Sequence, residues 1–73
     1  MRRIYVVVME TDTFYTFYQT LSNMQKVKRL IEKRTERHFD YTKLTRHFKD
    51  NDRLIIPGRK NGEKWTIVAT QLE

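Results

Sequence analysis

The sequence contains no cysteine, one proline, two glycines and a single serine, Ser22, in 73 residues. Without cysteine it can form neither a disulfide nor a thiolate metal site, and it offers no thiol nucleophile. Two glycines are too few for a glycine-rich phosphate loop. Because small secreted domains are usually held together by disulfides, the absence of cysteine favours a reducing compartment such as the cytoplasm.

Long hydrophobic runs are also missing. The longest, Ile4–Met9, has six residues, whereas a signal peptide needs about 7–15 and a membrane span about 20. We therefore expect no membrane partner, and the β-branched residues of this run predict a central β-strand. With 38% hydrophobic residues, the chain predicts one small domain over residues 1–73 with a thin core, which a homodimer would enlarge.

An aromatic segment, Phe14–Thr20, follows the first run after a polar break. Phenylalanine and tyrosine favour strands, so this segment predicts a second strand that forms a hairpin with the first. The same residues allow an alternative, in which Asp12 or Thr13 caps a helix that continues through Leu21. The sequence leaves strand and helix open for residues 14–20.

The middle of the chain has the period of two helices. Apolar residues recur every three or four positions from Met24 and predict a helix that ends near Arg37 or His38. Asp40 is suited to cap a second, shorter helix over about Tyr41–Lys49.

The last third of the chain predicts a hairpin of two strands, Leu54–Ile56 and Trp65–Thr70, whose connection contains Asn61-Gly62, a strong signal of a tight turn. The element order is therefore β-β-α-α-β-β. The predicted fold class is α+β, a small antiparallel sheet of about four strands with two helices packed on one face. The helices would pack through five apolar residues, which are Met24, Val27, Ile31, Leu44 and Phe48.

The net positive charge of the chain comes from the region of the two predicted helices. The net charge of the chain is +6, and residues 1–24 and 50–73 are each neutral. Residues 25–49 contain nine basic residues against Glu32, Glu36 and Asp40, which accounts for the whole net charge. Such an asymmetry points to an anionic partner, with a solvated helix face as the alternative.

The spacing of the basic residues predicts a phosphate-binding surface. On the first helix, four of them fall within about 80° of one another, opposite the apolar side. Lys43, Arg46 and His47 share a face of the second helix, and the predicted hairpin adds a basic tip. We therefore predict a non-enzymatic module that contacts the phosphate backbone of DNA or RNA. Its eight candidate residues are Lys26, Arg29, Lys33, Arg37, Lys43, Arg46, Arg59 and Lys60.

Aromatic residues suggest a second hypothesis. Tyr15 and Phe17 would lie on one face of the second strand and Tyr18 on the other, so one aromatic face remains uncovered by helices. The chain could be a small inhibitor or adaptor, of the type that phages make, that blocks a host nucleic-acid-processing or defence machine. It would dock on an acidic or nucleic-acid-binding surface of that host protein, with these three aromatics as hot spots.

Catalytic motifs are scarce. His38 and His47 are nine residues apart, with no further ligand at metal spacing, so we expect no metal and no cofactor. A remote alternative is a metal-independent ribonuclease, in which His47 acts with Lys43 and Arg46.

The two helices followed by a basic hairpin also loosely resemble a winged helix-turn-helix, which would require residues 13–21 to be helical.

Overall fold

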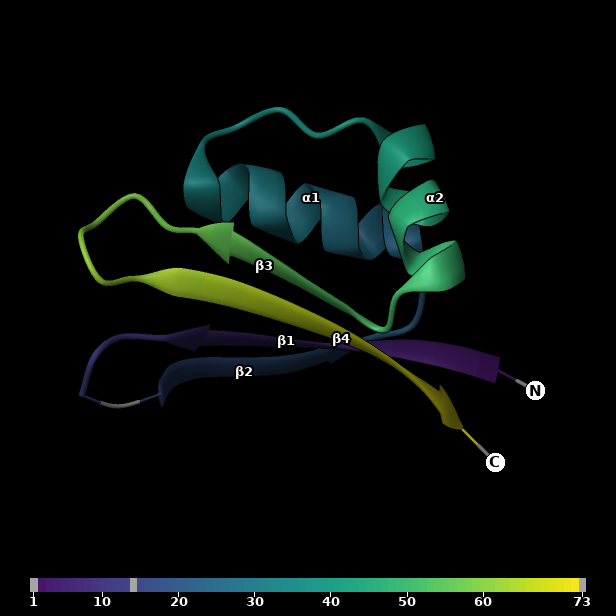
Figure 1. Ribbon diagram of the computed structural model, residues 1–73, viewed down its shortest axis with the longest axis horizontal. Helices are drawn as coiled ribbons and strands as arrows, with labels where there is room; N and C mark the ends of the chain where they lie inside the picture. Colours follow the sequence, from purple (N-terminus) through teal and green to yellow (C-terminus); the bar gives the residue numbers. More distant parts are fainter. Residues whose placement is uncertain (1, 14, 73) are drawn as a thin grey trace.

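Four strands form one antiparallel sheet, and two helices cover one of its faces (Figure 1). This computed structural model describes residues 2–13 and 15–72, with side chains for residues 3–13 and 18–71. The α+β class and the predicted order β-β-α-α-β-β are confirmed. In chain order, the elements are β1 (Arg2–Glu10), β2 (Tyr15–Leu21), α1 (Met24–Thr35), α2 (Tyr41–Asp50), β3 (Arg53–Pro57) and β4 (Lys64–Leu72).

Strand β1 lies in the middle of the sheet, as its apolar composition predicts. The strand order is β2-β1-β4-β3, so β1 pairs with its hairpin partner on one side and with β4 on the other. Because residues 15–21 form β2, the helical alternative for the described part of this segment is wrong. The winged helix-turn-helix resemblance fails with it, since that fold needs a helix there.

The core lies between the sheet and the helices. Alternate residues of the strands face the helices and are buried, as Val7 and Ile67 show at 0% exposure. The predicted helical contacts are confirmed, since all five of those apolar residues are buried. The buried hydrophobic residues are Tyr5, Val7, Leu21, Met24, Val27, Ile31, Leu44, Phe48, Ile56, Trp65, Ile67 and Ala69.

Side-chain caps fix where each helix begins. The Asn23 side chain accepts a hydrogen bond from the Lys26 backbone N–H (2.9 Å), and Asp40 does the same for Lys43 (3.1 Å). Helix α1 ends at Thr35, earlier than the period predicts, because Glu36 adopts a left-handed conformation with φ of 56°. Arg37 therefore lies outside the helix.

The two hairpin tips meet at one end of the sheet. Gly62, in the predicted Asn61-Gly62 turn, has φ of 80°, which favours glycine. A Cβ atom there would lie 2.9 Å from the Asp12 carboxylate of the β1–β2 turn, so this exposed side chain would have to move. The β3–β4 tip reaches the end of α1 as well, where Arg59 pairs with Glu36 at 3.4 Å.

The other face of the sheet carries no helix, and we call it the open face (Figure 1). A row of paired residues crosses all four strands on this face: Tyr18, Val8, Thr66 and Ile55. Tyr18 is 72% exposed and Ile55 is 55% exposed, so the row is apolar and accessible. Neither of the described helices is long and apolar enough to cross a membrane.

Candidate nucleic-acid interface

Three of the predicted basic residues form a stripe on the outside of α1. Lys26, Arg29 and Lys33 are exposed and lie opposite the buried residues Val27 and Ile31. We call these three the outer stripe. The prediction that Arg37 continues this stripe is wrong, because the left-handed residue Glu36 ends the helix before it. Arg37 is exposed in the loop between the helices.

The acidic residues of the helical region are engaged away from the outer stripe. Glu32 binds the Lys28 amine and His38 Nδ1, each at 3.1 Å, and Glu36 binds Arg59. Among the residues whose side chains are described, Arg29 and Lys33 form no ion pair. Their charges are therefore available to a partner.

Glu32 anchors the loop that follows α1. Its carboxylate accepts a hydrogen bond from the Phe39 backbone N–H at 2.8 Å. That hydrogen bond, followed by the one from the Lys28 amine, holds the pKa of Glu32 below its ordinary value of 4.5. Glu32 is thus ionised at neutral pH, and it faces the α1–α2 loop.

The basic residues of α2 lie on two flanks of the helix. Lys43 and His47 line a groove toward β3, whereas Arg46 lines a pocket toward β1. The three positions fall within about 100° of arc on the helix, away from Leu44 and Phe48, but the two edges of this arc line different cavities. Positions 43 and 47 are one turn apart, while position 46 is rotated by about 100° from 47, which is far enough for it to line the other cavity.

The groove toward β3, which we call the histidine groove, holds both histidines of the chain and has a volume of about 510 Å³. His47 Nε2 lies 2.8 Å from the Arg53 carbonyl oxygen, and His38 Nδ1 contacts Glu32. The described residues contain no cluster of three or more potential metal ligands. Of the three residues in the ribonuclease alternative, Lys43 and His47 line this groove together with His38, whereas Arg46 lines the pocket toward β1.

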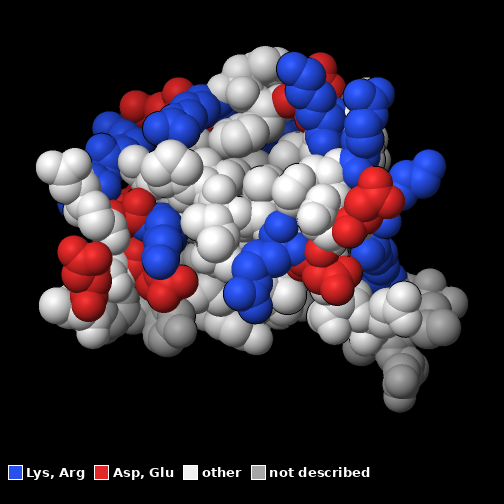
Figure 2. Space-filling view, in the orientation of Figure 1, with Lys and Arg blue, Asp and Glu red and all other residues white. Residues whose placement is uncertain are grey.

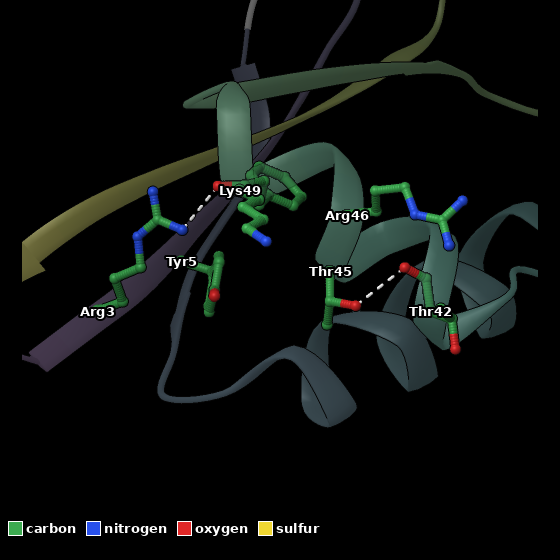
Figure 3. Close-up of a pocket in the computed structure, with 7 residues that line it drawn as sticks. Arg3, Tyr5, Thr42, Thr45, Arg46 and Lys49 are labelled. Carbon is green, nitrogen blue, oxygen red and sulfur yellow. Dashed lines mark hydrogen bonds between the residues drawn. The ribbon is translucent and has the colours of Figure 1, made fainter.

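The pocket toward β1 was not predicted from the sequence. It has a volume of about 460 Å³, and we call it the basic pocket (Figure 3). Arg3 and Lys49 contribute positive charges to this pocket, and neither is among the eight predicted candidate residues. The period of two in β1 is a signal that could have found Arg3, because Arg3, Tyr5 and Val7 alternate toward the helices. The pocket is lined by Arg3, Tyr5, Thr42, Thr45, Arg46, Phe48 and Lys49.

On the face seen in Figure 2, the basic residues do not form one continuous track. Figure 2 shows Lys and Arg gathered at the two ends of the helical layer, with acidic residues among them and an uncharged band between. Arg59 and Lys60 are exposed at the hairpin tip, where Arg59 shares its charge with Glu36. The candidate interface therefore centres on the outer stripe, with the α2 residues and the hairpin tip at its margins.

The aromatic hot-spot prediction is only partly covered by the structure. Tyr18 is exposed on the open face, in the central row with Val8. The side chains of Tyr15 and Phe17 lie outside the described part of the chain. Tyr18 is thus available to a partner on the side of the molecule opposite the outer stripe.

Known proteins give no further guide to the site. No protein-family model, no curated protein and no solved structure matches this chain. Its function must therefore be argued from its own residues.

Proposed function

We propose that this chain is a non-enzymatic module that binds the phosphate backbone of DNA or RNA through the outer stripe of α1. The observation that carries the proposal is the exposure of three cations opposite the core, none of which forms an ion pair with a residue whose side chain is described. We extend the proposed contact to the surrounding basic residues, namely Arg37, Lys43, Arg46, Arg59 and Lys60. The proposed location is the cytoplasm, which rests on the lack of cysteine.

The spacing of the outer stripe suits a polyanion. Lys26 and Lys33 are seven residues apart, which corresponds to about 10 Å along a helix axis. Measured along the DNA axis, one strand of B-DNA presents about three phosphates over that distance, at about 3.4 Å of axial rise per phosphate. Lysine and arginine on a helix surface contact phosphates without selecting bases, so we expect little sequence preference.

Lys33→Glu is expected to weaken nucleic-acid binding by about tenfold or more, because it removes a charge-assisted contact and adds repulsion. The loss should be similar for all base sequences, and the slope of log affinity against log salt should fall by about 1. Fluorescence anisotropy with labelled duplex DNA, single-stranded DNA and RNA, across about 50–200 mM salt, measures both quantities.

Lys64→Glu is the matched control for this experiment. It makes the same charge change, but Lys64 alternates with the buried Trp65 in β4 and so lies on the open face. The Lys64→Glu variant should bind nucleic acid with an affinity close to that of the native chain. Equal losses in the two variants would show that only net charge matters, and no binding by the native chain at low salt would end the proposal.

Protein binding is the second candidate function, because the open face exposes apolar side chains. The central row contains Tyr18 and Ile55 and has no charged residue. We propose a second copy of this chain as its occupant. Two chains of charge +6 repel each other at their helical layers, and the uncharged row is where they can approach most easily. The inhibitor or adaptor hypothesis stays a prediction, for which this row supplies a surface.

Self-association through the open face predicts that Ile55→Glu converts a dimer into a monomer. The added carboxylate of each copy would be buried in the two-fold interface without a partner. Sedimentation velocity over a range of protein concentrations measures the change, with Lys60→Glu as a control outside the face. A native chain that stays monomeric at every concentration contradicts self-association and leaves the row to a different protein.

A further inference from the structure

The basic pocket has the composition of an anion site. Its lining residues include three cations, Arg3, Arg46 and Lys49, and three hydroxyl groups, those of Tyr5, Thr42 and Thr45. None of the lining residues is acidic. We propose that this pocket binds a phosphomonoester, and specifically the terminal phosphate of a nucleic-acid strand. The identity of that ligand rests on the proposed function.

Arg3 is held in place by the end of α2. Its guanidinium donates a hydrogen bond to the Phe48 carbonyl oxygen at 2.7 Å and lies 3.7 Å from the Asp52 carboxylate. Phe48 O is one of the last carbonyl groups of α2, so Arg3 also offsets the negative end of the helix dipole. A guanidinium has five N–H donors, and these two contacts leave others for a ligand.

Two further groups, Tyr5 and Lys49, approach the space beside Arg3 from two elements. Figure 3 shows Arg3 and Tyr5 extending from β1, and Lys49 extending from α2 toward the space beside them. The Tyr5 ring is buried and packs edge-on against Phe48, with ring centroids 5.6 Å apart, so its position is fixed. Arg46 lies one turn before Lys49 in α2, near Thr42 at the other end of the pocket, and its side chain extends away from Arg3 and Tyr5, so the phosphate is proposed to contact Arg3 and Lys49.

The charge in this pocket suits a terminal phosphate better than an internal one. A phosphomonoester carries about −1.5 to −2 charges at pH 7 and presents three free oxygens. An internal phosphodiester carries a single charge, and evenly spaced single cations, as in the outer stripe, are sufficient for it. The pocket volume of about 460 Å³ also leaves room for the attached sugar.

The test compares three forms of one labelled oligonucleotide, with a 5′-phosphate, with a 3′-phosphate and with neither. The native chain should bind a phosphorylated end about tenfold more tightly than the form with hydroxyl ends, as expected for charge-assisted contacts. Lys49→Gln should abolish this preference and leave affinity for the hydroxyl form nearly unchanged. Lys60→Gln, the same substitution outside the pocket, should preserve the preference. Arg3 is left intact because it also joins β1 to α2.

Competition by adenosine monophosphate, with adenosine as the reference, shows whether a free nucleotide is bound as well as a strand end. Equal affinity for all three oligonucleotides would overturn the pocket proposal and leave the proposed function standing. If no oligonucleotide binds, the proposed function fails, and the pocket is tested by amide NMR shifts of Thr42 and Lys49 on addition of adenosine monophosphate. The absence of those shifts would then overturn the pocket proposal too.

Discussion

Val7→Asp is expected to abolish folding, whereas Val8→Asp, one residue further along β1, leaves the fold intact. Val7 is 0% exposed and lies between β2 and β4 on the face that the helices cover. A carboxylate there would lose its hydration with no cation beside it, at a cost of several kcal/mol. A chain of 73 residues has about 4–11 kcal/mol of stability in total, so that cost consumes most of it.

Val8 supplies a matched control because it bears the same substitution on the open face. Its side chain is partly exposed, so an aspartate there keeps contact with water and costs about 1 kcal/mol in strand propensity. Circular dichroism and urea unfolding separate the two variants. A Val7→Asp chain that unfolds cooperatively near the native midpoint would contradict the assigned core. Unfolding of Val8→Asp as well would mean that the fold requires a covered open face.

Phe48→Ala is expected to lower the free energy of unfolding by about 3–5 kcal/mol. Phe48 is 1% exposed and is one of the largest fully buried side chains. Its ring packs edge-on against Tyr5 and His47, with centroids 5.6 and 5.3 Å away. Removing it leaves a cavity under α2, and urea denaturation followed by circular dichroism measures the loss.

Tyr41→Ala tests whether the loss comes from burial and not from the removal of an aromatic ring. Tyr41 belongs to the same helix but is 44% exposed, so its replacement should change the free energy of unfolding by about 0.5 kcal/mol or less. Similar losses in both variants would contradict the packing of α2 described above.

Most of the fold could be predicted from local sequence patterns. The alternation of Trp65, Ile67 and Ala69 with Thr66 and Thr70 identifies the buried face of β4, because side chains of a strand point to opposite sides, whereas the all-apolar run Ile4–Met9 predicts the central strand without showing which of its faces is buried. The cap residues Asn23 and Asp40 precede their helices. The end of α1 was misplaced because the left-handed conformation of Glu36 has no signal in the residue type, which is rarely left-handed.

The candidate site could be predicted less completely, because it depends on how the elements pack. A helical wheel identifies the outer stripe, since it needs only the geometry of one helix. It does not show that Lys43 and Arg46 line different cavities, because those cavities are formed by β3 and β1. Arg3 and Lys49 are 46 positions apart, and only the docking of α2 beside β1 brings them to one pocket.

The pairing of β1 with β4 sets the order in which this molecule can form. These neighbours in the middle of the sheet join opposite ends of the described chain, with Arg2 opposite Leu72. On a ribosome, β1 is synthesised before β4, so it lacks its second neighbouring strand until β4 has emerged. Strand β3 likewise has no strand to pair with until β4 is complete. The early hairpin of β1 and β2 is marginal alone. The closure of this long loop, with its entropic cost, therefore limits how fast the sheet assembles.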